Sequence, residues 1–399
     1  DVAAFIRPET VHVKSLTAPE KFSVLEQNYE YDLINRDKLL DKYVGQKIKL
    51  FNWNEYQDKK ETLEATLISN NNGQIYQIGE EIFLGHPGYS VLPSIPENLI
   101  AQPTLTWLFS NAMAAPQDVE VSYLTDNITW KADYVLVVGE NDASGDLSAW
   151  VTLDNKSGAT YQDAKLKLVA GKVNLAQERG SKRDSFRMEK ASMMLDAGQG
   201  FEEESLFEYH LYDLQRKTTI KDNQTKQISL LEAKGLTLQK ELSVGGGQPW
   251  WFPQYFSEPQ TKQPVNVLIK VRNSEANRLG MPLPAGIVRL YKEDKDGSLQ
   301  FIGEDNIDHT PKDEEIKLKV GEAFDVVAER RQVAFQQISQ KVYESQWEIT
   351  LRNHKKEDVV IGVVESLEGF GNWKIFANSH PYETLNARTL RFNFPVALE

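Results

Sequence analysis

Apolar and polar residues alternate most clearly in residues 123–174 of this 399-residue chain. Tyr134, Leu136 and Val138 occupy one phase of the pattern, out of phase with the residues between them, and lysines alternate with leucines in DAKLKLV. Successive side chains of a strand point to opposite faces, so this pattern predicts consecutive antiparallel strands packed on one face. We expect Trp130, Tyr134 and Leu136 to belong to the core.

The N-terminal part of the chain predicts strands around one short helix. In residues 1–34, PETVHVKSL and FSVLEQNYEY read as two strands that pair with a later part of the chain. In NRDKLLDKYVG, Asn35 is placed to cap a helix and Gly45 to end it. Short strands with tight turns then follow from Gln46 to Pro93, so residues 35–97 predict a small SH3-like or Sm-like β-barrel module that serves as an inserted structural module, the alternative being a binding module.

The remaining strands predict two larger domains. Residues 98–244, including the weaker strand signal TLTWLFSN, are typical of a first β-sandwich. Residues 176–205 lack strand periodicity and read as a flexible insertion, either disordered or containing a short helix. Residues 245–264 form a Gly/Pro/aromatic linker, and residues 265–399 carry nine strand patterns of a second sandwich. The predicted fold class is therefore mainly β, with two antiparallel β-sandwich domains and a small barrel.

Several segments also carry a family resemblance. Residues 123–174, FEYHLYDLQRKTTIKDNQTKQISLL, MPLPAGIVRLYKED and YESQWEITLRNHK together resemble the bacterial family known as domain of unknown function 4139, distantly similar to the mucoidy inhibitor A group. The resemblance covers most of the chain and implies an exported, β-rich protein. It implies no catalytic residues, since the role of the family is not established.

Composition narrows the range of partners and compartments. The 45 basic and 58 acidic residues give a net charge of −13 without a dense basic segment, so nucleic acid is not an expected partner. The absence of cysteine excludes disulfides, thiolate metal sites and a cysteine nucleophile, and is compatible with a periplasmic or extracellular location. No apolar run is long enough for a transmembrane segment. The chain starts at Asp1 without a signal-like segment, and we expect an exported protein whose signal peptide has been removed.

An acidic loop is one candidate for chemistry. Asp305, Asp308, His309 and Asp313 lie within EDNIDHTPKDEE, where the carboxylates could raise the basicity of the histidine or bind a cation. The alternative is a solvated loop between strands. No histidine has a partner at the spacing of a zinc site, and no cofactor motif is present, so neither a metal nor a cofactor is predicted. The nearby run EDKDGS predicts a hairpin in which Asp296 and Gly297 supply the residues with positive φ.

The linker is the other candidate, because it concentrates aromatic side chains. They are Trp250, Trp251, Phe252, Tyr255 and Phe256. Exposed aromatic rings can anchor a protein interface or stack on a sugar. The alternative is that these rings fold back over a domain seam and become part of a core.

Two classes of function fit these patterns. The first is a non-enzymatic, exported protein that binds a protein partner or self-associates through sheet edges at the bacterial cell envelope or outside the cell. The second is a hydrolase, or a carbohydrate-binding accessory protein with a glycan partner, whose site is the acidic loop or the aromatic linker.

Overall fold

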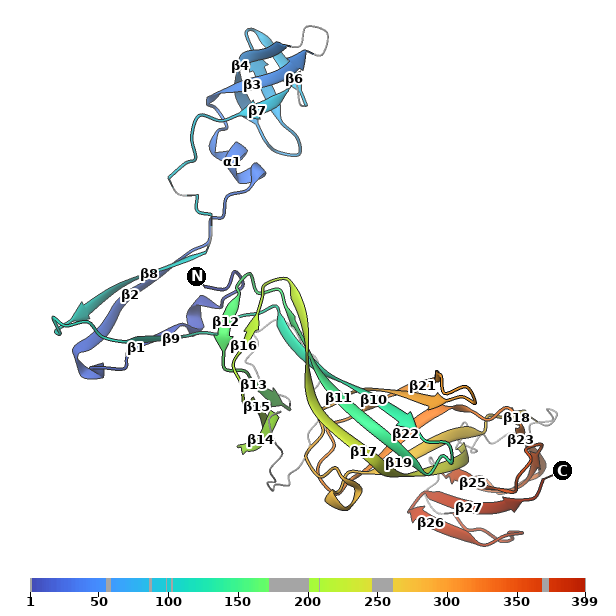
Figure 1. Ribbon diagram of the computed structural model, residues 1–399. Coiled ribbons are helices and arrows are strands. Elements are labelled where there is room, and N and C mark those ends of the chain that lie inside the picture. Colours follow the sequence, from blue (N-terminus) through green and yellow to red (C-terminus); the bar gives the residue numbers. More distant parts are fainter. Residues whose placement is uncertain are drawn as a thin grey trace. The chain divides into compact units, whose positions relative to one another are not determined.

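The computed structural model (Figure 1) shows a mainly β protein with several antiparallel sheets. It describes residues 2–54, 59–85, 88–97, 99–101, 103–171, 201–207, 209–245, 261–367 and 373–398. None of the helices in these ranges combines the length and apolar character that crossing a membrane requires. The chain divides into two compact units. The first comprises Asp1–Ile128, Asp154–Tyr161 and Ile220–Gln224, and the second Thr129–Leu153, Gln162–Thr219 and Thr225–Glu399.

The first unit contains a small sheet next to one helix. The helix α1 (Arg36–Lys42) is followed by β3 (Lys47–Asn54), β4 (Lys59–Ser69), β5 (Ile75–Ile78), β6 (Glu81–Leu84) and β7 (Tyr89–Val91). The side chain of Asn35 accepts a 2.9 Å hydrogen bond from the backbone N–H of Lys38, which confirms the predicted helix cap. Gly45, with φ +82°, lies just beyond the helix, where the left-handed conformation favours glycine.

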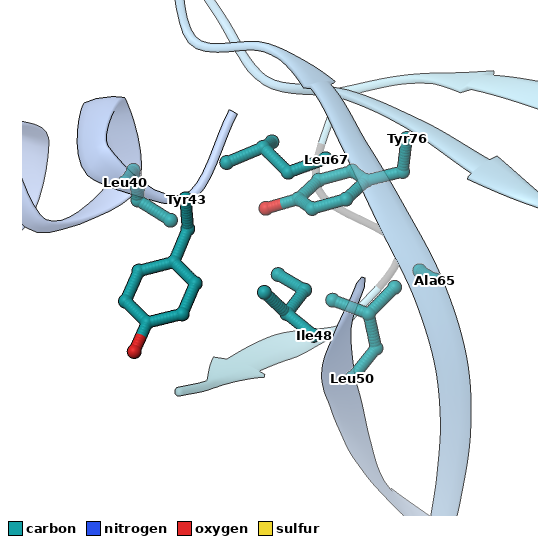
Figure 2. Packing of buried hydrophobic residues seen from close by; sticks show 7 residues of the cluster. All are labelled: Leu40, Tyr43, Ile48, Leu50, Ala65, Leu67 and Tyr76. Carbon is teal, nitrogen blue, oxygen red and sulfur yellow. The ribbon is translucent and has the colours of Figure 1, made fainter. Parts of the chain in front are cut away.

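The small sheet has the strand order β6-β5-β4-β3-β7. Its buried face packs against α1, and Figure 2 shows the apolar side chains of helix and strands pointing toward one another. These side chains are Leu40, Tyr43, Ile48, Leu50, Ala65, Leu67 and Tyr76. Because β6 and β7 lie at opposite edges and no ladder joins them among the described residues, the sheet is open. The described residues therefore form no closed barrel here, which corrects the predicted SH3-like or Sm-like barrel, although its strands are present.

Two ribbons flank this sheet in the sequence. β1 (His12–Ser15) pairs with β9 (Val119–Ser122), and β2 (Phe22–Glu30) pairs with β8 (Thr104–Asn111), each antiparallel. The N-terminal strands thus pair with later segments, and TLTWLFSN is a strand, while the expectation that these partners belong to a later sandwich stays a prediction. Each ribbon is a two-stranded sheet within the described part of the chain.

The second unit is built on a ten-stranded sheet. Its main order is β21-β20-β10-β11-β17-β25-β27-β26, and β19 pairs with both β17 and β22. The strands are β10 (Ile128–Val138), β11 (Ser144–Asn155), β17 (Gln224–Gly245), β19 (Asn266–Arg272), β20 (Gly286–Glu293), β21 (Leu299–Ile307), β22 (Glu315–Glu322), β25 (Val359–Ser366), β26 (Tyr382–Asn386) and β27 (Thr389–Val396). Strands from both sides of residues 245–264 thus share one sheet, while the arrangement of predicted sandwiches stays a prediction.

Not all neighbours in this sheet are antiparallel. β10 pairs with β20, and β17 with β25, in parallel ladders. Antiparallel direction is imposed by short hairpin connections, and these two pairs join segments that are far apart in the sequence. The prediction of purely antiparallel sheets therefore fails for these two ladders.

The ten-stranded sheet curls so that two of its strands meet without a ladder. A Cβ on Gly303 of β21 would lie 2.1 Å from the carbonyl oxygen of Val320 of β22, and Asp305 Oδ2 accepts a 2.7 Å hydrogen bond from the backbone N–H of Lys319.

The predicted core residues Tyr134 and Leu136 are buried, with exposed fractions of 0% and 1%, and they line part of an apolar cavity of about 10 Å³. Both core predictions are confirmed. Trp130 is half-buried, with its ring edge-on to Tyr212.

Shorter strands complete the second unit. β13 (Lys167–Ala170), β15 (Tyr209–Leu214) and β14 (Phe201–Leu206) form one three-stranded sheet, and β18 (Thr261–Gln263), β23 (Val326–Ser339) and β24 (Val342–Asn353) form another. β12 (Tyr161–Ala164) pairs with β16 (Thr218–Ile220). Residues 201–205 of the predicted insertion belong to strand β14 and are not a flexible loop. Residues 176–200, the rest of that insertion, lie outside the described residues.

Three asparagines at strand ends are fully buried. Asn155, Asn273 and Asn353 are each 0% exposed, and each donates from Nδ2 to backbone carbonyls while Oδ1 accepts a backbone N–H. For Asn353 the acceptors are the carbonyls of Glu357 and Val396. A buried amide is stable only when its polar atoms are paired, so these residues fix the chain where it leaves a strand.

Candidate interaction surface

The ribbon formed by β23 and β24 extends beyond the sheet that anchors it. The two strands pair from Val326–Asn353 to Ser339–Val342. The third strand, β18, pairs only with residues 328–330 of β23. Past Arg330, the described residues therefore form a two-stranded ribbon.

One face of this ribbon begins in a buried core. Val326 and Ala328 of β23 pack with Ile361 and Val363 of β25 in one apolar cluster. Alternate residues of a strand share a face, so the next inward positions are Arg330 on β23 and Glu365 on β25. Their side chains are only 11% and 9% exposed, and Arg330 Nη2 donates a 3.1 Å hydrogen bond to Glu365 Oε2.

Burial dominates the electrostatics of this pair. Desolvation raises the pKa of Glu365 to about 7, against the opposing effect of the Arg330 charge. Desolvation likewise lowers the pKa of Arg330 to about 10, so the guanidinium stays charged at neutral pH. Glu365 is therefore the member of the pair that titrates near neutrality.

A small cavity adjoins the Arg330–Glu365 pair. Its volume is about 10 Å³, and Gly245, Gln263 and Val364 contribute to its lining. This is about the space that one water molecule needs, whereas sites for small organic ligands span roughly 300–1,000 Å³. The cavity can hydrate the ion pair, but its described walls leave no room for a substrate.

The same ribbon face continues outward as an aromatic stripe. The guanidinium of Arg330 lies 4.6 Å from the ring centroid of Trp347, whose Nε1 donates a 2.6 Å hydrogen bond to Ser345 Oγ. Beyond them, Phe335 and Tyr343 stack at 5.9 Å with an angle of 21° between the rings. In the ladder, Gln332 pairs with Trp347 and Phe335 pairs with Ser345. Paired residues share a face, as do alternate residues of one strand, so all of these side chains lie on the same face of the ribbon.

The distal end of the ribbon is exposed. We call the side chains of Phe335, Ile338, Val342 and Tyr343 the ribbon tip. Ile338 is 54% exposed, Val342 52% and Tyr343 38%, while Phe335 is half-buried. The ribbon therefore carries apolar side chains from a covered core at one end to solvent at the other.

Four charged side chains on the opposite face of the ribbon form two ion pairs. Arg331 bonds to Glu348, and Arg352 forms two hydrogen bonds of 2.7 and 3.1 Å with Glu329. These pairs span the two strands and hold the ribbon together. The apolar face is left without a competing charge between Trp347 and the tip.

The acidic segment proposed from the sequence lies elsewhere: Asp305 belongs to β21, and Asp308, His309 and Asp313 follow in the loop after that strand. Asp308, His309 and Asp313 are exposed, and Asp305 bonds to the backbone of Lys319 as described above. His309 Nδ1 accepts a 3.1 Å hydrogen bond from the backbone N–H of Ala285. In the described ranges no group of three or more His, Cys, Asp or Glu side chains is arranged to hold a metal ion. An acid/base role for this loop stays a prediction.

The aromatic linker residues Trp250, Trp251, Phe252, Tyr255 and Phe256 lie outside the described residues. Sequence reasoning did not identify Arg330, Glu365 or the ribbon tip. One signal was present, since Arg330 continues the alternating row that starts with Val326 and Ala328. Its partner on β25 is 35 residues away, and no sequence pattern links the two.

Comparison with known proteins identifies a family and nothing narrower. Residues 119–368 match the family model described as domain of unknown function (DUF4139). No curated protein and no solved structure matches the chain.

Proposed function

Because this chain belongs to the DUF4139 family, whose description assigns no activity, we propose its function from the ribbon: it is a non-enzymatic protein that binds a protein partner at the bacterial cell envelope or outside the cell. The ribbon tip is the surface that meets the partner.

One observation carries this proposal, namely the exposure of the tip. An isolated two-stranded ribbon is marginally stable in water, and apolar side chains at its end favour association. Phe335 and Tyr343 are already stacked on each other, so little side-chain entropy is lost when a partner covers them. Aromatic anchors of this kind are enriched at the centres of protein interfaces.

The location is part of the proposal. A chain without cysteine is compatible with an oxidising compartment, and the family resemblance noted from the sequence points to export. Fractionation of producing cells tests this directly: we expect the protein in the periplasmic, envelope or culture fraction. Recovery with cytoplasmic markers would refute the location.

Binding is tested by sedimentation of the purified protein with envelope fragments of the producing bacterium. The test variant is Phe335→Ser combined with Tyr343→Ser. The matched control is Phe324→Ser combined with Phe376→Ser, which removes two aromatic rings that are 96% and 75% exposed elsewhere on the same unit.

We expect the tip variant to bind at least tenfold more weakly than wild type and the control to bind like wild type, since only the tip rings belong to the proposed interface. Circular dichroism verifies that both variants are folded. Equal binding by both variants, or no sedimentation of the wild type, would exclude the proposed role of the tip.

A further inference from the structure

Strand β8 differs from every other long strand in the described part of the chain. It is the only strand of eight or more residues that contains no charged side chain. The uncharged stretch continues on both sides and spans residues 98–117. In a chain in which 26% of the residues are charged, this stretch is a marked local exception.

β8 is also an edge strand. Within the described residues its only ladder is with β2, in a two-stranded sheet. Proteins normally protect such edges with charges, proline or very short strands. β2 carries Glu26 and Glu30, whereas TLTWLFSN has none of these protections. Between residues 105 and 111, the backbone donors and acceptors that do not bond to β2 point away from it.

The side chains of β8 are ordered and partly uncovered. Trp107 Nε1 donates a 2.9 Å hydrogen bond to Gln27 Oε1, and the ring of Phe109 lies 5.2 Å from that of Phe22. Leu108 is 53% exposed and Phe109 51%. The ribbon therefore presents a formed, apolar edge.

From this edge we infer that β8 pairs with β8 of a second copy of this chain, which forms a four-stranded antiparallel sheet. A strand satisfies the outward backbone groups of the edge between residues 105 and 111, whereas lipid offers them no hydrogen bonds. Each copy of the chain has a net charge of −13, so two copies repel each other. A contact surface between them is therefore favoured where the sequence has no carboxylates. β8 lies in such a stretch of the sequence, and two-fold pairing sets the strand against itself.

Antiparallel pairing centred on Trp107 is also complementary in side chains. Leu105 of one copy is then opposite Phe109 of the other, and Thr106 is opposite Leu108. Only uncharged residues meet, with Leu105 and Phe109 forming apolar pairs, and the sheet grows from two strands to four, past the three that independent stability requires. This inference deepens the proposed function, on which it rests, because it names a second copy as one of the partners.

The test is sedimentation equilibrium of the full chain. The variant Thr106→Lys with Leu108→Lys places lysines of the two copies opposite each other. The matched control is Ile82→Lys with Leu84→Lys, which introduces two lysines at the same spacing on β6, another edge strand, where these residues are 66% and 81% exposed. Circular dichroism confirms that each variant is folded.

We expect the wild type and the β6 control to dimerise and the β8 variant to raise the dimer dissociation constant more than tenfold. A wild type that is monomeric at several hundred micromolar overturns the inference. Dimerisation of the β8 variant with wild-type affinity also overturns it.

A disulfide experiment tests the edge independently of stability, because the chain has no cysteine. Mixed Thr106→Cys and Leu108→Cys proteins should form a disulfide-linked heterodimer on mild oxidation, and an Ile82→Cys protein should not. The absence of the heterodimer contradicts pairing centred on Trp107. Binding of the monomeric protein to lipid vesicles, without any dimer, assigns the edge to a membrane and overturns the inference.

The outcomes also separate this inference from the proposed function. Loss of the dimer in all conditions, with envelope binding intact, removes the β8 inference alone. Conversely, a normal dimer whose envelope binding does not depend on Phe335 and Tyr343 removes the proposed role of the ribbon tip alone.

Discussion

Glu365 illustrates how position within a strand determines the chemistry of a residue. It follows Ile361 and Val363 on the inward face of β25, and Arg330 holds the corresponding place on β23. The apolar rows bury both charges, and the short distance between them compensates only in part for the lost solvation. A carboxyl that would titrate near 4.5 in solvent therefore titrates at about 7.

This shift predicts how stability depends on pH. Between pH 4.5 and about 7 the folded protein holds a proton on Glu365 that the unfolded chain releases, so the free energy of unfolding falls as the pH rises through this window. Glu365→Gln cannot titrate and should lack this component, which we expect to amount to roughly 2–3 kcal/mol. Urea unfolding of both proteins at pH 5, 6, 7 and 8 measures it. Parallel stability profiles would show that Glu365 is not perturbed.

Asn353 provides a second prediction at the scale of single residues. Replacing this buried side chain with alanine removes its hydrogen bonds to the carbonyls of Glu357 and Val396, which should cost about 1–3 kcal/mol of unfolding free energy. The control is Lys356→Ala, an exposed change in the same turn that we expect to be neutral. Chemical denaturation compares the two, and a neutral Asn353→Ala would mean that water replaces the amide.

At the scale of elements, local signals in the sequence were reliable where one segment determines its own structure. The cap at Asn35 and the hairpin between β20 and β21 are examples. The hairpin turn still differs in detail, because only Gly297 has positive φ, and Asp294 Oδ1 accepts the backbone N–H groups of Asp296 and Ser298 instead. A carboxylate before the turn thus does part of what a second residue with positive φ would have done.

The helix α1 allows the cap to be tested. Asn35→Ala removes the bond to the N–H of Lys38 and should weaken the helix by about 1 kcal/mol, whereas Asn35→Asp keeps the acceptor. Hydrogen exchange of residues 36–43 should accelerate roughly fivefold in the alanine variant and little in the aspartate variant. Equal acceleration in both would point to a cause other than the cap.

Elements formed by distant segments were not predictable in the same way. The parallel ladders β10–β20 and β17–β25, the open small sheet and the Arg330–Glu365 pair all depend on which strands become neighbours. Period-two patterns show which face of a strand is apolar but not which strand covers it. The ribbon tip could not be predicted for the same reason. Phe335 and Tyr343 have the sequence pattern of core residues, but in the structure Phe335 is only half-buried and Tyr343 is exposed.

At the scale of the whole molecule, the described chain combines well-filled apolar cores with two incompletely covered ribbons, one in each unit. The two cavities described above are each about 10 Å³, and the ribbon tip and β8 are among the places where apolar side chains are exposed in the described part of the chain. These features favour a protein that works through its surfaces, which is the basis of the proposed function.

Site-specific photo-crosslinking in producing cells tests this claim most directly. A photoreactive phenylalanine analogue replaces Ile338 at the ribbon tip or, as control, the exposed Lys356. We predict a discrete crosslinked adduct from position 338 in the envelope fraction and none from position 356. An exported, folded protein that gives no adduct at position 338 would contradict the proposal that the ribbon tip binds a protein partner.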